Sequence, residues 1–299
     1  MNKKNTNKKR DVNSKKLKII GVDVGGTKIA AGTLVDRKLI DAVEVPIHAQ
    51  MPLKDILHQI EAVIDLIWDK SVRAIGVGVP SIVDTNRGFI RETQNIPKLA
   101  RVELSSILSK KYRVPVFVQN DAKCFAFGQL TDDEQHIVGL ILGTGVGAGI
   151  IIDGKIYCGQ NGTAGEVGGI LNSESITFEQ SLGGHEIYSQ TGISVAQWAK
   201  SAMSHDKKAK KLFDDYGKIL GELLYYITIT YNPSRIVLGG SISKSAQVFL
   251  GASKKIMIKR LANQFSYAKP PLITVAPDKY PGVIGAAKLA LSAIQSRRR

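Results

Sequence analysis

Long apolar runs and a secretory leader are both missing from this 299-residue sequence. No run approaches the ~20 apolar residues of a membrane-spanning helix, and the lysine-rich N-terminus lacks the apolar core of a signal peptide. Cysteine is scarce too: Cys124 and Cys158 are the only two, and their spacing is not that of metal ligands. We therefore expect a cytoplasmic protein with free thiols and no zinc site.

Acidic residues are few relative to basic ones, 26 against 41, and the net charge is +15. Residues 1–18 alone carry +7 and the final three arginines add +3, which leaves +5 for residues 19–296. The basic N-terminal segment contains no aromatic side chain that could stack on bases. We expect residues 1–17 to be a disordered tail, with no specific nucleic-acid partner. Hydrophobic content of 43% and charged content of 22% are typical of a soluble globular chain.

Residues 138–156 form the most informative stretch. A short apolar run leads into a turn with glycine at alternate positions, 143 to 149, then a β-branched run and Asp153-Gly154. This order predicts strand, glycine turn, strand, tight turn, strand. The exposed amides of such a turn can bind an anion, although a glycine hairpin shaped only for packing has the same pattern. A dinucleotide fingerprint is excluded because a helix does not follow.

The same plan occurs once more near the start of the chain. A strand ending at Asp23 is followed by Gly25-Gly26-Thr27-Lys28, a second strand to Val35, a polar turn and a third strand. A Walker A loop is excluded because Thr27, not glycine, precedes Lys28. The two copies predict an internal duplication, one copy in each of two α/β domains.

Between and after the two copies, strand and helix patterns alternate. Residues 74–79 should form a buried strand ending at Pro80, with Asp84 and Gly88 in a turn, and residues 114–118 a further strand. We expect later strands at residues 235–238 and 272–275. The expected helices cover residues 53–69, 104–111, 122–130, 178–191, 195–203, 211–230, 247–262 and 285–294.

Carboxylates and amides gather where strands end. Asn120 and Asp121 follow the strand at 114–118, and in open α/β sheets ligands collect at the carboxyl ends of strands. A loop from Gly159 to Gly169 carries a single acid, Glu166. A carboxylate beside a cleft can orient a hydroxyl and accept its proton, and two opposed glycine turns can hold a polyphosphate. An N-cap role for Asp121 is the structural alternative.

Together these motifs resemble the ROK family of sugar kinases and transcriptional repressors, in the actin-like ATPase, ribonuclease-H-like superfamily. The resemblance extends from about Lys18 to the C-terminus, and the order of the motifs makes it specific. It rests on residues 22–28, 76–80 with Asp84, 94–97, 119–122, 143–149, 162–166, 237–240 and 281–287.

The resemblance implies two ribonuclease-H-like α/β domains with a cleft between them. The N-terminal domain would cover residues 18–121 and the C-terminal domain 122–284, with the last helix, about 285–296, packing back on the first. It also implies ATP and Mg²⁺ as cofactors, a sugar as substrate and a homodimer.

Individual roles follow from matched positions. Asp121 matches the general base that takes a proton from the sugar hydroxyl, usually the one on carbon 6. The positions that match sugar-binding residues are Asn95, Asn120, Asp121, Glu166 and Glu179. The positions that match the ATP site are Asp23, Gly25, Gly26, Thr27, Lys28, Gly143, Thr144, Gly145, Gly239 and Gly240. Several have plainer alternatives: Asn95 and Asn120 as turn residues, Lys28 as the partner of a surface acid, and Gly239-Gly240 as a helix-start turn.

Two departures from the family pattern matter. Gly168-Gly169 stands where zinc-containing members have glycine and histidine, and residues 170–177 contain no cysteine. We therefore predict no structural zinc and one altered wall of the sugar pocket, which would either admit a bulkier substituent or weaken activity. His185 lies nearby but is expected on a helix surface. The rivals are a catalytically silent sugar sensor and a ROK repressor; only about eighteen polar residues precede the first strand, too few for a DNA-reading module.

Overall fold

The computed structural model describes residues 17–93, 95–265, 267–277 and 279–297. The predicted disordered tail therefore falls outside the described residues except for Leu17, and so does Gln94 of the 94–97 motif. No helix in these ranges is both long and apolar enough to cross a bilayer.

The N-terminal half is built on a five-stranded sheet with the order β3-β2-β1-β4-β8. Its first three strands are antiparallel, whereas β4 and β8 run parallel to β1. The central strands are almost wholly apolar because helices cover both faces. The strands are β1 (Lys18–Val24), β2 (Lys28–Val35), β3 (Lys38–Pro46), β4 (Val72–Val79) and β8 (Val116–Asn120).

The C-terminal half repeats this sheet strand for strand, with the order β11-β10-β9-β12-β13. Three antiparallel strands again come first, and two strands parallel to β9 follow. The identical order and directions agree with the internal duplication that the two glycine turns predict. The strands are β9 (Ile137–Leu142), β10 (Val146–Ile152), β11 (Lys155–Ile156), β12 (Arg235–Gly239) and β13 (Leu272–Val275).

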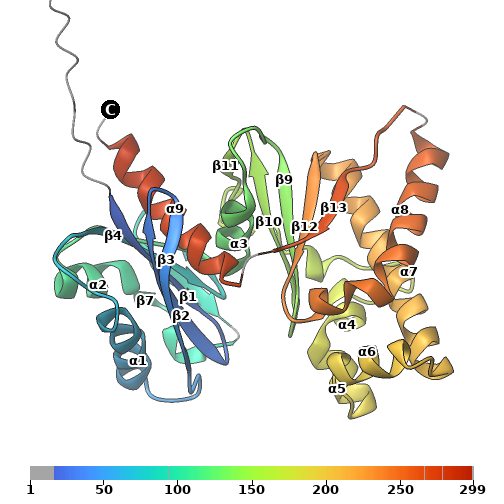
Figure 1. Ribbon diagram of the computed structural model, residues 1–299, viewed down its shortest axis with the longest axis horizontal. Helices are drawn as coiled ribbons and strands as arrows, with labels where there is room; N and C mark the ends of the chain where they lie inside the picture. Colours follow the sequence, from blue (N-terminus) through green and yellow to red (C-terminus); the bar gives the residue numbers. More distant parts are fainter. Residues whose placement is uncertain (1–16, 94, 266, 278, 298–299) are drawn as a thin grey trace, which may run out of the picture.

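Helices cover the outer face of each sheet (Figure 1). We call the first sheet, with its outer helices and the small sheet described below, the N-terminal lobe, and the second sheet with its outer helices the C-terminal lobe. The N-terminal lobe has α1 (Leu53–Asp65) and α2 (Leu104–Tyr112). The C-terminal lobe has α4 (Phe178–Leu182), α5 (Gly184–Thr191), α6 (Val195–Met203), α7 (Lys207–Tyr231) and α8 (Leu250–Gln264).

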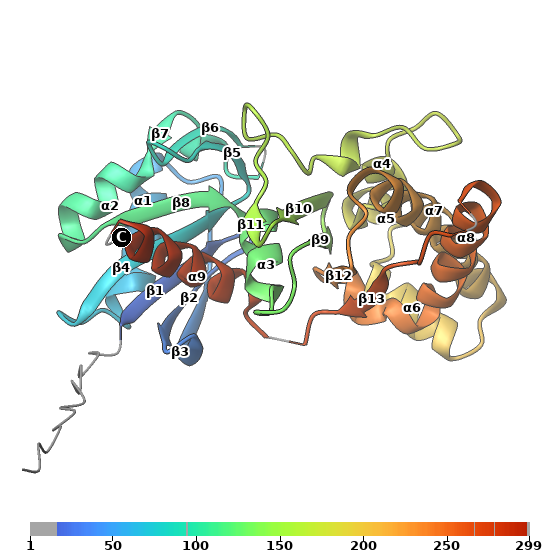
Figure 2. The same cartoon turned by 90° about the horizontal axis from the view of Figure 1, so that it is seen from above.

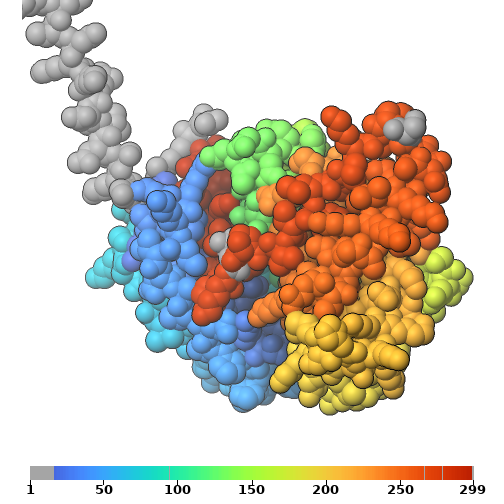
Figure 3. Space-filling view, turned by 45° about the vertical axis from the view of Figure 1, so that its right-hand side comes forward, coloured from blue at the N-terminus to red at the C-terminus, as the bar shows by residue number. Residues whose placement is uncertain are grey.

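Two further helices lie between the sheets, and each covers the sheet of the other half (Figure 2). α3 (Asp121–Gln129) follows the last strand of the first sheet and packs on β9 and β10. α9 (Pro281–Ser296) follows the last strand of the second sheet and packs on β1 and β4, where Ala287 and Ala290 join Ile19 in a buried cluster. In the space-filling view the red C-terminal segment lies between the blue and the orange parts (Figure 3).

α3 and α9 cross each other with almost no side chain between their backbones. A Cβ atom at Gly285 of α9 would overlap the carbonyl oxygen of Cys124 in α3, and one at Gly128 would lie 2.5 Å from the carbonyl oxygen of Pro281. Gly76 of β4 is pressed equally closely against Ala286. Small residues therefore allow the two helices and the first sheet to meet at backbone distance.

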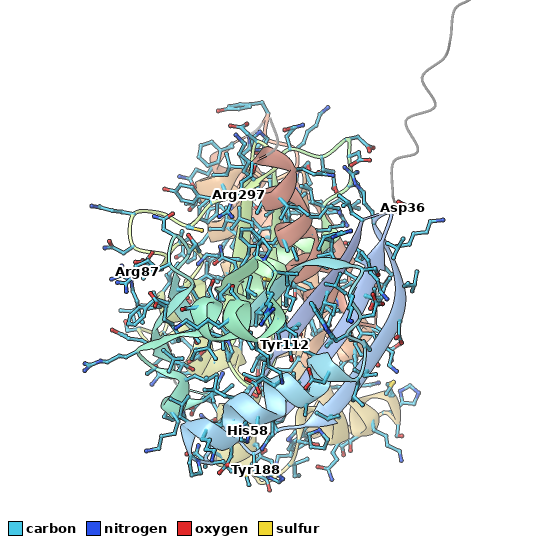
Figure 4. The ribbon with its side chains drawn as sticks, turned by 90° about the vertical axis from the view of Figure 1, so that its left-hand side faces the viewer. Asp36, His58, Arg87, Tyr112, Tyr188 and Arg297 are labelled. Atoms are coloured by element: carbon cyan, nitrogen blue, oxygen red, sulfur yellow. The ribbon has the colours of Figure 1, made fainter. Side chains whose placement is uncertain are left out.

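Side chains at the edge of the first lobe hold its helices in place (Figure 4). The Tyr112 hydroxyl of α2 donates to Asp65 at 2.7 Å, and its ring lies 4.8 Å from that of Trp68. At the far end of α9, the Arg297 guanidinium lies 5.2 Å from the centre of the Phe117 ring in β8. Both contacts lie away from the cleft and stabilise the lobe itself.

A third, small sheet was not predicted. The segment after Pro80 was expected to be a turn, but it forms β5 (Ser81–Asp84) and β6 (Phe89–Thr93), which pair with β7 (Val102–Glu103). Asp84 therefore ends a strand, and the turn that follows contains Gly88 in the left-handed region. Short strands with an exposed face carry too few apolar residues for their pattern to be recognised.

Most expected helices are present with shifted ends, and one expectation is wrong. The single helix expected over 178–191 is two helices, because the chain bends at Gly183, where a Cβ atom would lie 2.6 Å from the carbonyl oxygen of Glu179. The first helix ends at Asp65, four residues earlier than expected. Residues 242–248 form a 3₁₀ helix, so α8 begins at Leu250, not at 247.

The crossing of α3 and α9 generates a stability prediction. Gly285→Ala should lower the free energy of unfolding by about 3 kcal/mol, because its methyl group must displace the backbone of Cys124. Urea unfolding measures the change. The matched control is Gly251→Ala on the exposed side of α8, where nothing lies within 4 Å; it should stabilise the protein by up to about 1 kcal/mol. Equal effects of the two substitutions would contradict the close crossing.

Candidate functional site

A cavity of about 470 Å³ lies where the strand ends of both lobes meet, a volume suited to a small organic ligand. Ten of the residues singled out from the sequence line it together. They are Gly25, Gly26, Asn95, Asn120, Asp121, Gly143, Thr144, Gly145, Glu166 and Glu179. Residues up to 154 positions apart in the chain are thus brought to one place.

Each glycine turn presents backbone amides to this cavity. Within the part of the chain that the structure describes, the amides of Gly26, Thr144 and Gly145 form no hydrogen bond, whereas the Gly25 amide closes its own turn on the Lys28 carbonyl at 2.9 Å. Backbone amides without partners, arranged in a turn, form an anion-binding concavity. The two turns come from corresponding places in the two sheets, after β1 and after β9.

The second turn is held from behind by Glu179. Its carboxylate accepts a hydrogen bond from the Val146 amide at 2.9 Å and lies directly against Gly145. The amides of Gly184 and His185 donate to the carbonyls of Gly143 and Thr144 at 2.8 and 3.2 Å. The bend at Gly183 is what directs the first turn of α5 at these carbonyls. Glu179 therefore both lines the cavity and fixes the shape of the turn.

The structure separates two roles at the start of α3: Asn120 caps the helix, and Asp121 is its first residue. The N-cap of α3 is Asn120, whose side-chain oxygen accepts from the Lys123 amide at 3.0 Å while its amide nitrogen donates to the Ser81 carbonyl at 3.3 Å. The N-cap alternative for Asp121 is therefore wrong. Asp121 is the first residue of the helix, its carboxylate accepts from the Ala122 amide at 2.8 Å, and it lines the cavity.

Burial makes the carboxylates of the cleft harder to ionise. The pKa of Asp121 is raised from 3.8 to about 6, chiefly by burial; the hydrogen bond from the Ala122 amide acts against this rise, and the charge of Glu166 adds to it. Burial, with the nearby charge of Asp121, raises the pKa of Asp23 to about 7. The pKa of Glu166 is raised by burial and by Glu179, against the lowering effect of Lys123. A carboxylate with a pKa near neutrality is suited to accept a proton.

Five predicted residues lie outside the cavity lining. Asp23 lies just behind it, against Gly282 in the first turn of α9. The Lys28 amine donates to Glu44 at 2.7 Å on an exposed surface, which is the surface pairing weighed as its alternative. Thr27 is exposed beside it. Gly239 and Gly240 pack against the Phe125 ring and the Leu142 backbone; their nucleotide contact stays a prediction.

Sequence reasoning missed part of the lining. Ser81, Ile82, Glu92 and Thr93 belong to β5 and β6 and form one wall. Residues 89–93 read Phe-Ile-Arg-Glu-Thr, with no alternation of apolar and polar positions, so the sequence offered no clear strand signal for this wall. Lys123 was missed as well: it lies two residues after Asp121 in α3 and is only 1% exposed.

The two glycines at 168 and 169 differ in what they permit. A Cβ atom at Gly168 would overlap the Val146 carbonyl, so glycine is required there. At Gly169 nothing lies within 4 Å, its φ is not in the left-handed region, and it lines the cavity. The backbone would therefore accept a side chain at 169, and its absence leaves open space. Among the described residues no group of three or more His, Cys, Asp or Glu side chains could hold a metal ion; the absence of zinc stays a prediction.

Comparison with known proteins identifies the family. The model of the ROK family matches residues 19–293. The chain belongs to the ROK family.

Its relatives include sugar kinases of similar length. A glucokinase of Thermotoga maritima is 25% identical over 92% of this chain and 97% of its own. An N-acetyl-D-glucosamine kinase of Mannheimia succiniciproducens is 30% identical over 92% of this chain and 99% of its own.

Solved structures agree with the fold. The crystal structure of a ROK family glucokinase from Streptomyces griseus, in complex with glucose and AMPPNP, has a TM-score of 0.78 at 25% identity and covers 92% of this chain and 99% of its own. A ROK family transcriptional regulator, described as a homologue of the E. coli MLC protein, reaches 0.81 at 18% identity over 94% of this chain and 79% of its own; that likeness concerns the fold alone. The two-domain, actin-like ATPase fold expected from the sequence is confirmed.

The raised pKa of Asp23 gives a prediction about stability. The folded protein keeps this proton up to about pH 7, whereas the unfolded chain releases it near 3.8, so ionisation costs stability as the pH rises through that window. Asp23→Asn should raise the free energy of unfolding by about 1–2 kcal/mol at about pH 8, and the gain should shrink towards about pH 5. Urea unfolding without nucleotide measures it.

The matched control is Asp215→Asn. Asp215 is paired with Lys218 and Lys211 on the surface of α7, and these partners lower its pKa. Its substitution should bring no gain at about pH 8. A pH-independent effect of Asp23→Asn would show that Asp23 is not held protonated in the fold.

Proposed function

We propose that this chain is an ATP-dependent sugar kinase that phosphorylates a hydroxyl of a hexose or an N-acetylhexosamine, with Asp121 as the general base. The observation that carries the proposal is the cavity in which Asp121 faces two glycine turns with free amides. Sugar kinases among its ROK relatives, one of them crystallised with glucose and AMPPNP, support the same function. The hydroxyl on carbon 6 is the proposed acceptor.

The phosphoryl-transfer side of the reaction requires positioning and charge stabilisation more than covalent chemistry. The amides of Gly26, Thr144 and Gly145 would bind phosphate oxygens of ATP, one turn from each lobe. Asp23, just behind the cavity lining, would help to hold a Mg²⁺ ion once its carboxyl is ionised, since this ion is commonly held by one or two carboxylates together with substrate phosphates and water. When bound, Mg²⁺ would neutralise charge on the phosphates.

On the sugar side, polar side chains from both lobes surround the same cavity. Asn95 and Asn120 would bond sugar hydroxyls from the N-terminal lobe, and Glu166 and Glu179 from the C-terminal lobe. The Asp121 carboxylate would accept the proton of the attacking hydroxyl and raise its nucleophilicity. Closure of the two lobes would exclude water and limit wasteful hydrolysis of ATP. A cytoplasmic homodimer is the proposed form of the enzyme.

The alternative is a catalytically silent sugar sensor. It is favoured by the open wall at Gly169, where a side chain that would orient the sugar is missing. The likeness in fold to a transcriptional regulator does not distinguish the two, because sensor and kinase share the fold. The carboxylate of Asp121 and the two free-amide turns are the features that a sensor would not need.

An assay of ADP release with Mg-ATP across glucose, fructose, mannose, N-acetylmannosamine and N-acetylglucosamine tests the proposal directly. Asp121→Asn should lower kcat by about 10²–10⁴-fold, because the amide cannot accept the proton, while the affinity for ATP stays near that of the unmodified protein. The control is Asp84→Asn, since Asp84 pairs with Arg91 outside the cavity lining. Absence of turnover on every sugar would favour the sensor. Near-normal turnover of Asp121→Asn would show that Asp121 is not the general base.

The empty wall at residue 169 gives a specificity prediction. Gly169→His should reduce kcat/KM for N-acetylglucosamine relative to glucose by about tenfold, because the imidazole fills space beside Glu166 that an N-acetyl group would occupy. Gly169→Ala, which adds one methyl group in the same place, should change the ratio less. An unchanged ratio in both variants would mean that this wall does not contact the substrate.

A further inference from the structure

Lys123 is a charged side chain in the interior, which is costly unless the charge has partners. It belongs to α3, is 1% exposed, and stands among the largest fully buried side chains of the protein. Its amine donates to the Gly162 carbonyl at 2.6 Å. Burial lowers its pKa, and the charges that oppose this include those of Glu166 and Asp121. An apolar residue would fill the space at less cost, so the amine needs a function.

The Lys123 amine is hydrogen-bonded to the loop that carries Glu166. This Glu166 loop, residues 157–169, is tied to β10 at both ends: the Tyr157 amide donates to Ile150, and the Ala148 amide donates to Gly165. For the tip, residues 159–163, the bond from Lys123 is the only hydrogen bond to a residue outside the loop within the described chain. The Lys123 amine is therefore what anchors the tip of the loop to α3.

The tip also reaches the other lobe. A Cβ atom at Gly162 would lie 3.0 Å from the Val83 carbonyl of β5, and Gly162 has a φ of +84°. β5 contributes Ser81 and Ile82 to the cavity wall. Lys123 thus reaches the Glu166 loop at the point where it touches the wall formed by the N-terminal lobe.

We propose that Lys123 is a positioning residue for the sugar site: its buried amine anchors the tip of the Glu166 loop to α3 and thereby sets Glu166 relative to Asp121. Because Lys123 and Asp121 are on the same short helix, the base and the sugar-binding acid share one support. The kinetic part of this proposal rests on the proposed sugar-kinase function; the anchoring of the loop does not.

Cys158 provides a readout that is independent of turnover. It is partly exposed at the start of the same loop, and the Gln119 side-chain amide donates to its sulfur at 3.4 Å. Cys124 is fully buried and serves as an unreactive reference in the same chain. Release of the loop should therefore expose Cys158 to iodoacetamide and leave Cys124 unmodified.

Lys123→Met tests the proposal, because methionine fills a similar space without the charge or the donor. We expect KM for the sugar to rise about tenfold, kcat to stay within about threefold and KM for ATP to be unchanged, since the amides proposed to bind ATP belong to the two glycine turns and not to this loop. Alkylation of Cys158, followed by mass spectrometry, should be about tenfold faster. The melting temperature should change little, because the desolvation cost of the buried ammonium is removed together with its hydrogen bond.

Lys218→Met, which removes a surface lysine paired with Asp215, is the matched control and should behave as the unmodified protein. Unchanged sugar KM and unchanged Cys158 alkylation in Lys123→Met would overturn the proposal. So would a lower melting temperature with an unchanged sugar KM, which is the signature of a merely structural lysine. If the unmodified protein turned over no sugar, the kinase function would fail, and the alkylation rates would still decide whether Lys123 anchors the loop.

Discussion

The contact between α3 and α9 is the constraint on which the rest of the structure depends. Both helices lie between the two sheets, and each follows the last strand of one sheet but covers the other. Their backbones touch at Gly285 and Gly128, where no side chain larger than hydrogen fits. The distance between the lobes, and with it the width of the cleft, is therefore set by backbone contact, which cannot be adjusted by repacking side chains.

This crossing also places the carboxylates of the cleft. Asp121 begins α3, and Asp23 lies against the first turn of α9, so the two acids stand at the ends of the two crossing helices. Their proximity raises the pKa of Asp23 in addition to the effect of burial. Two glycine turns at equivalent places in the duplicated sheets face the same space. The arrangement brings the Asp121 carboxylate and the two glycine turns together from parts of the chain that are separate in the sequence.

Much of this could be predicted from the sequence, and the limits have physical causes. The glycine turns and Asn120-Asp121 were recognisable because backbone geometry at a strand end demands particular residues. The third sheet was missed because β5 and β6 are short and half exposed, with little apolar pattern. Lys123 was missed because local sequence gives no sign of burial: a lysine in a helix is usually solvated, and only the fold brings the Gly162 carbonyl to its amine. The break at Gly183 was likewise set by a distant partner, the turn at Gly143 and Thr144.

The return of α9 to the first sheet has a consequence for how the protein is made. α9 follows every other described helix and strand in the chain, yet Ala287, Ala290 and Ile294 complete the cluster around Ile19, Leu34 and Ala74. While the ribosome is still translating the second half, the inner face of the first sheet has no cover, although its strands have already left the exit tunnel. The first sheet therefore completes its packing only after α9 has been made, and its apolar inner face is the surface on which a chaperone would act during synthesis.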